Sequence, residues 1–475
     1  MKKKPTLKNL QTRLFAGNIT CVELVQDFLK RIAQKKKLNI FLEVFREEAI
    51  FLAKKIDEKI IKKTAGKLAG LVVGIKDNIC YKGHSVTASS QILKGFHSTY
   101  SATVINRLLK EDAIIIGRIN CDEFAMGSTN ENSAYGLVRN PLNKNLTPGG
   151  SSGGCAAAVS ANLCHVAMGS DTGGSIRQPA SFCDVIGFKP SYGMVSRHGL
   201  IAYASSFDQI GPIAQSVEYI DEVMKIISGT DTFDSTCVFS KKDYNTSLKK
   251  RKKMKISVIK DAATHHLLHP DVKKSFSKLL EKIKNSGHEI KYVEMPILNY
   301  LVPTYYILTT AEASSNLARY DGIKYGMSQR ENISNWEDLI KQTRSRGFGK
   351  EVKRRILLGT FVLSEGYYDN YYSKAQKIRR LVKDKTKEML KFSDFILLPT
   401  SPTTPFKLEE EHKDPTILYL QDVFTVQANL SGNPAISIPI FKYKNDSPVG
   451  AQLIGKTGKD RELLSFGNHI LKNYV

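Results

Sequence analysis

The first part of the chain has apolar residues at helical spacing. Thr20 and Glu23 are three residues apart, as in a capping box that starts a helix. The residues that follow recur every three or four positions and would form one apolar face: Leu24, Val25, Phe28, Leu29 and Ile32. This pattern predicts a helical lead over residues 1–65.

Short apolar runs bounded by glycine and polar residues come next, and they alternate with helical stretches such as 103–109 and 271–283. The pattern predicts strands buried on both faces and therefore an α/β fold, with a sheet covered by helices on both sides. Residues 300–390 are expected to be mainly helical. No Pro/Ser-rich linker divides the chain, so we predict one domain over 1–475. The predicted strands are 70–75, 113–116, 163–168, 255–259, 395–398, 435–440 and 449–454.

Composition is that of an ordinary soluble protein, with 41% hydrophobic and 24% charged residues. No apolar run approaches the ~18 residues of a membrane span. The basic start at 1–5 lacks the apolar core of a signal peptide, so a cytoplasmic or organelle-matrix location without membrane attachment is expected. The seven cysteines form no C-x-x-C pair, which predicts reduced thiols and argues against structural zinc.

The formal net charge is +24. Such an excess is compatible with a nucleic-acid partner. The basic runs at 35–37 and 249–253 lack interleaved aromatic residues, however, so solvated surfaces explain them better.

Residues 147–187 form an unusual segment that is rich in glycine and serine. Glycine allows close approach of the backbone to a ligand, and hydroxyl groups beside backbone N–H donors suit acyl transfer. A flexible linker is a poor alternative, because the apolar runs 156–161 and 163–168 would be buried.

Two string matches lack the context that their motifs need. Residues 149–153 match G-x-S-x-G, but a nucleophile elbow follows a buried strand and the preceding residues 140–145 are polar. Residues 450–457 match the phosphate-loop string, yet 451–454 is expected to be a strand, with no apolar helix starting at Thr457. We interpret both as coincidences.

The glycine–serine segment and the residues Gly74-Ile75-Lys76-Asp77-Asn78 together resemble the amidase signature family. Lys76 to Ser151 is 75 residues and Ser151 to Ser175 is 24, and both intervals agree with the family pattern. The resemblance implies a large mixed sheet covered by helices on both faces, with residues 66–230 as the signature core.

The resemblance also implies a Ser–Ser–Lys triad. Ser175 would be the nucleophile, and Ser151 would pass its proton to Lys76. The backbone N–H groups of Thr172, Gly173 and Gly174, with that of Ser175 itself, would form the oxyanion hole. Lysine can act as a base only when burial lowers its pKa from about 10.4, and the apolar run 71–75 favours a buried position.

Within the family, further segments resemble the subunits that supply ammonia for tRNA-dependent amidation: 120–128, 206–212, 351–355 with 367–368, and 422–430. This likeness implies hydrolysis of glutamine and conversion of Glu-tRNA(Gln) to Gln-tRNA(Gln). It also implies a complex with two partner subunits (B and C), one of which contacts the tRNA and uses ATP and Mg²⁺. This chain would hold no cofactor and no metal.

The same likeness suggests how glutamine would be held. Arg355 would bind the carboxylate, Asp422 the ammonium, and Tyr306 would add a hydroxyl contact. The neighbours Arg354 and Tyr305 remain alternatives.

One residue departs from the family pattern. Asp184 stands where glycine is usual, and we expect it to be tolerated. Two other functions stay open, a stand-alone amidase for another carboxamide and a non-catalytic RNA-binding subunit. The paired Arg355 and Asp422 argue against the first, and an intact triad argues against the second.

Overall fold

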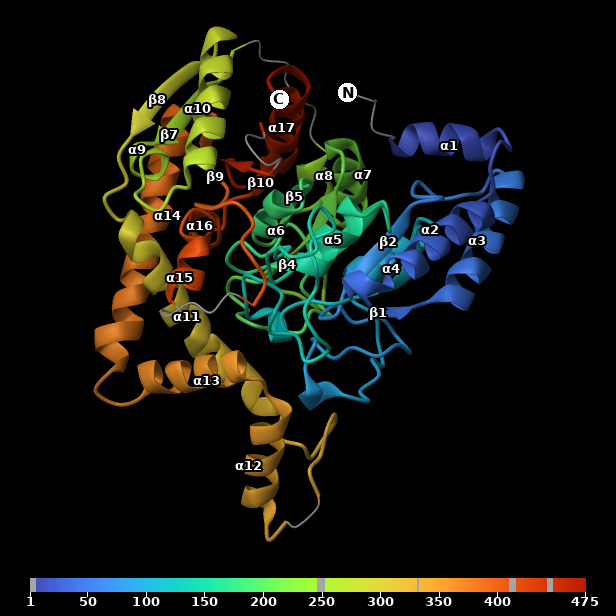
Figure 1. Ribbon diagram of the computed structural model, residues 1–475, viewed down its shortest axis with the longest axis horizontal. Coiled ribbons are helices and arrows are strands. Elements are labelled where there is room, and N and C mark those ends of the chain that lie inside the picture. The colour runs from blue at the N-terminus through green and yellow to red at the C-terminus, as the bar shows by residue number, and fades with distance from the viewer. Residues whose placement is uncertain (1–5, 246–252, 331–332, 410–415, 442–446) are drawn as a thin grey trace.

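The computed structural model describes residues 6–245, 253–330, 333–409, 416–441 and 447–475. One sheet of 11 strands crosses the molecule in the order β1-β3-β2-β4-β6-β5-β10-β11-β9-β7-β8. The N-terminal helices α1 to α3 lie at one end and helices α11 to α14 at the other, with α12 projecting from the body (Figure 1). The chain therefore has the α/β fold that the alternation of apolar runs predicted.

The sheet is mixed. The β3-β2-β4 and β9-β7-β8 groups are parallel, whereas the pairs that join them across the centre are antiparallel. The antiparallel β1 closes the end next to β3. The strands are β1 (Phe41–Val44), β2 (Val72–Lys76), β3 (Ile114–Ile119), β4 (Val166–Asp171), β5 (Ile186–Lys189), β6 (Gln209–Ala214), β7 (Lys255–Ile259), β8 (Glu289–Val293), β9 (Phe395–Pro399), β10 (Ala435–Pro439) and β11 (Gly450–Ile454).

Helices cover both faces of the sheet. They are α1 (Leu7–Phe15), α2 (Cys21–Gln34), α3 (Arg46–Ile61), α4 (Thr103–Lys110), α5 (Gly153–Ser160), α6 (Arg177–Phe182), α7 (Val217–Ile227), α8 (Lys241–Tyr244), α9 (Lys260–Ala263), α10 (Pro270–Asn285), α11 (Leu301–Asn316), α12 (Trp336–Gly347), α13 (Lys350–Leu363), α14 (Lys374–Phe392), α15 (Thr416–Tyr419), α16 (Val426–Ser431) and α17 (Asp460–Asn473).

Strand β9 shows how the sheet separates two hydrophobic cores. Side chains of a strand alternate between its faces. Phe395 and Leu397 belong to the core that contains the N-terminal helices, whereas Ile396 and Leu398 belong to the core beneath α11 and α14. A continuous apolar run is therefore required here, because neither face of the strand meets water.

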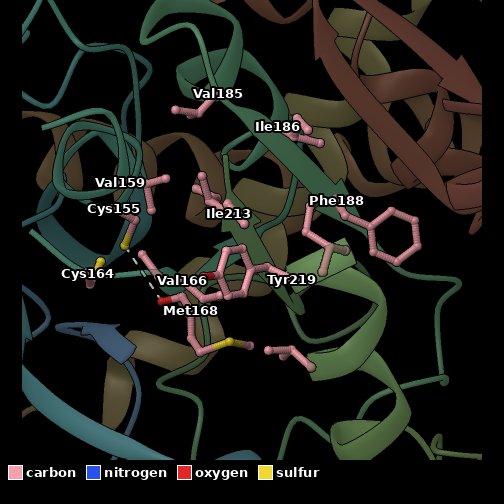
Figure 2. Packing of buried hydrophobic residues seen from close by; sticks show 14 of the residues in the cluster. Cys155, Val159, Cys164, Val166, Met168, Val185, Ile186, Phe188, Ile213 and Tyr219 are labelled. Carbon is pink, nitrogen blue, oxygen red and sulfur yellow. Dashed lines mark hydrogen bonds between the residues drawn. The ribbon is translucent and has the colours of Figure 1, made fainter. Parts of the chain in front are cut away.

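The glycine–serine segment is packed into the first core rather than extended as a linker. Figure 2 shows Cys155 and Val159 of α5 close to Val166 and Met168 of β4, and the Cys155 thiol donates to the Met168 carbonyl oxygen. From Gly153 to Val159, every residue of α5 is buried. Small residues at these positions let the helix approach the sheet closely enough to bring Ser151 and Ser152 to its edge.

Most predicted elements are confirmed. The capping box of Thr20 and Glu23 starts α2, and all seven predicted strands are present within a few residues of their expected ends. Residues 451–454 lie in β11, and α17 begins only at Asp460, so no phosphate loop is formed. Residues 140–150 contain no strand, which removes the nucleophile elbow as well.

Four strands, β1, β5, β6 and β8, were missing from the prediction. One of them, β1, interrupts the helical lead between α2 and α3. The seven cysteines are buried and none forms a disulfide. In the described ranges, no helix is long and apolar enough to cross a membrane.

Candidate active site

Lys76 lies where two parallel strands end at the same edge of the sheet. It is the last residue of β2, which pairs in parallel with β4, so the ends of both strands point to one place. Ser170 and Asp171 are the last residues of β4. Ligand and catalytic groups commonly gather at this edge in α/β proteins. Lys76, at the end of its strand, therefore lies next to the glycine–serine segment, as predicted.

The amine of Lys76 is fully buried and surrounded by hydroxyl groups. Its Nζ is 2.7 Å from Ser151 Oγ, 3.0 Å from Ser152 Oγ and 2.9 Å from Ser170 Oγ. Ser152 donates its own proton to the Ser170 carbonyl oxygen, and the Asn78 amide donates to Ser170 Oγ. The oxygens of Ser152 and Ser170 are thus placed to accept from Lys76, whereas Ser151 can donate to a neutral amine.

Burial lowers the pKa of Lys76, although nearby acidic groups, including Asp122 and Asp171, oppose part of this effect. No carboxylate oxygen lies within 4 Å of Nζ to form an ion pair with it in the described part of the chain. A lysine in such surroundings can be neutral near physiological pH and take a proton from a hydroxyl group.

Ser175 is attached to this centre through the backbone. Its carbonyl oxygen accepts from the N–H of Ser152 at 3.0 Å, and the residue is 9% exposed. Among the described residues, no hydrogen bond joins its hydroxyl to Ser151. Catalytic hydrogen bonds in ligand-free sites often form only when substrate binds. The structure therefore joins Lys76 to Ser151 directly and places Ser175 beside Ser152.

A buried ion pair supports the loop that carries Ser175. Asp171 Oδ1 and Oδ2 accept from the N–H groups of Gly174 and Ile176, at 3.0 and 3.2 Å. Arg177 binds both oxygens of Asp171 in a fork, at 3.0 and 2.9 Å. Although burial acts to raise the pKa of Asp171, Arg177 lowers it to about 2. The carboxylate thus stays ionised and holds the loop.

The glycines of this loop are required by space. A Cβ on Gly173 would lie 2.5 Å from Tyr305 Cζ, and one on Gly174 would lie 2.2 Å from Thr425 Oγ1. Gly174 also has a φ of +138°, which side chains rarely allow. Of the predicted oxyanion donors, the Gly174 N–H already binds Asp171. It would have to be shared or released to bind an oxyanion, and the roles of Thr172 and Gly173 stay predictions.

Arg355 of α13 is buried beside three tyrosine rings. Its Nε binds Glu351 Oε1 at 2.9 Å and its Nη1 donates to Tyr203 Oη at 2.9 Å. Its guanidinium carbon is 5.1 Å from the centre of the Tyr306 ring. Burial acts to lower the pKa of Arg355, but Tyr203, Tyr306 and Glu351 outweigh it and raise that pKa. Nη2 has no hydrogen-bond partner among the described residues, so it is available to donate to a bound anion.

Asp422 lies next to this arginine site and next to the Ser175 loop. Its Oδ2 accepts from Ser128 Oγ at 3.1 Å and from Tyr306 Oη at 3.4 Å. Three residues on, Thr425 Oγ1 donates to the Gly173 carbonyl oxygen at 2.6 Å. Burial raises the pKa of Asp422 to about 7. An anion-binding group and a cation-binding group therefore meet at Tyr306.

The two alternative residues occupy different places. The Arg354 side chain is 45% exposed and pairs with Glu351, whereas the Arg355 side chain is 5% exposed. The Tyr305 hydroxyl lies against Gly173, as the space around that glycine shows. Tyr306 is the tyrosine that contacts both Asp422 and Arg355.

A mostly apolar cavity of about 400 Å³ opens beside Arg355. Its lining residues include Tyr306, Arg354, Arg355, Leu358 and Tyr419. In the described ranges, no group of three or more His, Cys, Asp or Glu side chains could hold a metal ion.

Asp184 has a physical explanation. It follows α6 with a φ of +59°, in the left-handed region that favours glycine. Asp and Asn adopt this conformation more readily than other residues that carry a Cβ. The backbone at this turn therefore suits glycine and is open to aspartate, and tolerance of the carboxylate stays a prediction.

Comparison with known proteins agrees with this geometry. The family model described as Amidase matches residues 23–464, which is most of the chain. The chain belongs to the amidase family. Curated relatives include the glutamyl-tRNA(Gln) amidotransferase A subunit of Chlorobium phaeobacteroides, 48% identical over 461 residues and 96% of each chain. That of Trichormus variabilis is 46% identical, over 97% of this chain and 96% of its own.

Solved structures of the amidase family share the fold. The glutamyl-tRNA(Gln) amidotransferase A subunit of Thermotoga maritima superposes with a TM-score of 0.78 at 38% identity, over 99% of this chain and 95% of that one. A crystal structure described as an amidase gives a TM-score of 0.84 at 27% identity, over 99% and 100% of the two chains. The amidase signature fold inferred from the motifs is thereby confirmed.

Several residues of the site were not singled out from the sequence. Ser152 and Ser170 bind Lys76, and Ser128 binds Asp422. Ser170 could have been found from the sequence, because it follows an apolar run as Lys76 does. Tyr203 carries no such signal, because it meets Arg355 only through the folding of segments 152 residues apart.

Proposed function

We propose that this chain hydrolyses glutamine and supplies the ammonia that converts Glu-tRNA(Gln) to Gln-tRNA(Gln). The observation that carries the proposal is the meeting of buried Arg355 and Asp422 at Tyr306, next to the loop of Ser175. A carboxamide with both a carboxylate and an ammonium group fits this pair. The relatives at 46–48% identity are named as subunits of a glutamyl-tRNA(Gln) amidotransferase, and these names support amidation of the same tRNA.

The proposed reaction begins with proton transfer. Neutral Lys76 takes the proton of Ser151, Ser151 takes that of Ser175, and Ser175 Oγ bonds to the amide carbon. Backbone N–H groups of 172–175 stabilise the negative oxygen of the tetrahedral intermediate. The proton returns through Ser151 to the nitrogen as the C–N bond breaks, leaving ammonia and a glutamyl ester on Ser175. Water, deprotonated along the same path, then releases glutamate.

The ammonia would be used by a partner. We propose a three-subunit complex in which one of the partners binds Glu-tRNA(Gln) and activates its carboxylate with ATP and Mg²⁺. This chain would need no cofactor of its own. The names of the relatives, which identify each of them as one subunit of an amidotransferase, support assembly with other subunits.

Two assays on one variant test the proposal. In the complex, Ser175→Ala should abolish glutamine hydrolysis and glutamine-dependent amidation, while amidation with ammonium chloride continues. Ser160→Ala, a half-buried serine at the end of α5, is the matched control and should retain both activities. Unchanged ammonia release by Ser175→Ala would overturn the mechanism.

The same measurements separate the alternatives. Full amide hydrolysis by the isolated chain, without dependence on partners or tRNA, would favour a stand-alone amidase. Loss of ammonium-dependent amidation in Ser175→Ala would point to a structural role for this serine. An RNA-binding subunit would show no hydrolysis even when the triad is intact.

A further inference from the structure

The residues 203–208 form a connection between the substrate-binding arginine and the loop of Ser175. Asp208 lies at the centre of this connection and is 3% exposed. One of its oxygens, Oδ1, accepts from Thr172 Oγ1 at 2.6 Å. The other, Oδ2, accepts from the N–H groups of Tyr203 and Ala204, both at 2.9 Å. One carboxylate thus binds two segments at once.

The sheet fixes one half of this arrangement. Asp171, the last residue of β4, pairs with Gln209, the first residue of β6. Thr172 and Asp208 are the next residues outward on the two antiparallel strands and therefore face each other. Thr172 begins the loop that continues through Gly173 and Gly174 to Ser175. Its hydroxyl bond to Asp208 restrains the point from which the proposed oxyanion donors project.

The Tyr203 side chain completes the other half. Its hydroxyl accepts from Arg355 Nη1 at 2.9 Å and donates to Thr309 Oγ1 at 2.9 Å. Its ring is among the largest fully buried side chains of the molecule. With its N–H on Asp208 and its hydroxyl on Arg355, this residue cannot shift at one end without disturbing the other. A packed residue of this kind transmits displacement because protein interiors are close-packed.

We propose that Asp208 is a positioning residue that couples the Arg355 site to the alignment of the Thr172–Ser175 loop. When the α-carboxylate of substrate binds Arg355, the guanidinium is fixed, and Tyr203 and Asp208 hold Thr172 in the arrangement that stabilises the oxyanion. This inference rests on the proposed function, since it assumes a substrate whose carboxylate binds Arg355. An amide without that group would leave Arg355 unoccupied and the loop less well aligned.

A double-mutant cycle on this chain, purified with its proposed partner subunits, tests the coupling. Tyr203→Phe removes the hydroxyl that binds Arg355, and Thr172→Val removes the hydroxyl that binds Asp208, while both keep the backbone N–H. We expect each to lower kcat for glutamine by about tenfold, with KM changed less than about threefold. The double variant should be about as slow as either single variant, a coupling of at least about fivefold.

Independent effects would overturn the proposal. If the two substitutions multiply to about a hundredfold loss, Tyr203 and Thr172 do not act through one unit. If KM alone changes, Tyr203 serves only to bind substrate. The matched control is Tyr244→Phe in α8, a buried tyrosine that binds Asp221; alone it should leave kcat unchanged, and with Thr172→Val it should add nothing.

Two more variants keep the test decisive. Thr172→Ser retains the hydroxyl and should restore nearly full kcat, and Thr172→Ala replaces the valine variant if that variant does not fold. Asp208→Asn leaves one side-chain oxygen to accept from the three donors that now bind Asp208, namely the Thr172 hydroxyl and the N–H groups of Tyr203 and Ala204. It should therefore lower kcat at least as much as Thr172→Val. If the unsubstituted complex hydrolyses glutamine and the cycle shows no coupling, only this inference fails. If it hydrolyses no glutamine, the proposed function fails first.

Discussion

The Lys76 centre and the Arg355 site hold their charged groups in opposite ways. Lys76 is surrounded by neutral hydroxyls and has no carboxylate within ion-pairing distance among the described residues, so burial lowers its pKa. Arg355 is also buried but has Glu351 and three tyrosines around it, and its pKa is raised. The first site favours an amine that can lose its proton, and the second keeps a permanent positive charge.

This difference follows from the elements that build the sites. The Lys76 centre is made at the ends of β2 and β4 and by the two residues before α5, all within one stretch of the first half of the chain. The Arg355 site is assembled from α11, α13 and the 3₁₀ turn at Leu420–Asp422, far apart in sequence. The proposed catalytic groups therefore lie at the ends of sheet strands, and the proposed substrate-binding groups lie on helices and a turn.

The largest expected effect is the loss of the base at position 76. Lys76→Met should lower glutamine hydrolysis by about 10³-fold or more, because general-base assistance to Ser175 disappears. Lys76→Arg should be equally inactive, since a guanidinium keeps its proton. The measurement is kcat, with Lys67→Met, an exposed lysine before β2, as the control. An active Lys76→Arg enzyme would show that the two sites do not differ in the way described.

The second effect concerns the permanent charge. Arg355→Ala should lower kcat/KM for glutamine about 100-fold, because the carboxylate of the bound glutamine loses its buried partner. This loss corresponds to about 3 kcal/mol of binding free energy. Arg354→Ala, which removes an exposed guanidinium from the same helix, should change kcat/KM less than about threefold. The reverse ranking would assign recognition to Arg354.

The smallest effect is a pH dependence of binding. Burial raises the pKa of Asp422 to about 7, and only its ionised form can pair with an ammonium group. As pH falls through 7 the carboxylate gains a proton, so affinity is lost on the acid side. Calorimetry with non-hydrolysing Ser175→Ala should give a Kd for glutamine about tenfold higher at pH 6 than at pH 8.

Adding Asp422→Asn to that protein provides the control. The amide has no charge to titrate, so binding should be weaker at every pH and the dependence on pH should flatten. If the Kd of the Asn variant depends on pH as strongly as before, a group other than Asp422 causes that dependence.

The sequence predicted the strands that form clear apolar runs and missed four strands whose runs are short, interrupted or partly exposed. Strand β8 is the last strand of the sheet and is largely exposed, and β6 contains Pro212, which cannot donate to a neighbouring strand. Strands β1 and β5 have only four residues each. Periodicity detects burial, and these strands are short, interrupted or half-exposed.

The sequence predicted the two parts of the candidate site to different extents. Lys76, Ser151 and Ser175 follow from motif spacing, because local loops fix where they lie on the sheet. The partners of Arg355 do not, since Tyr203 and Glu351 meet it through packing of distant segments and through helix geometry. Sequence resemblance named Arg355 and Asp422, but only the structure shows that Tyr306 lies between them.

The most direct test of the proposed mechanism is to identify the residue that carries the acyl group. The complex can be quenched in acid during turnover of glutamine and digested, and the peptides analysed by mass spectrometry. The mechanism predicts a glutamyl ester on Ser175, absent from Lys76→Met and from Ser175→Ala. A glutamyl group on another residue, or full turnover with no acylated Ser175, would contradict it.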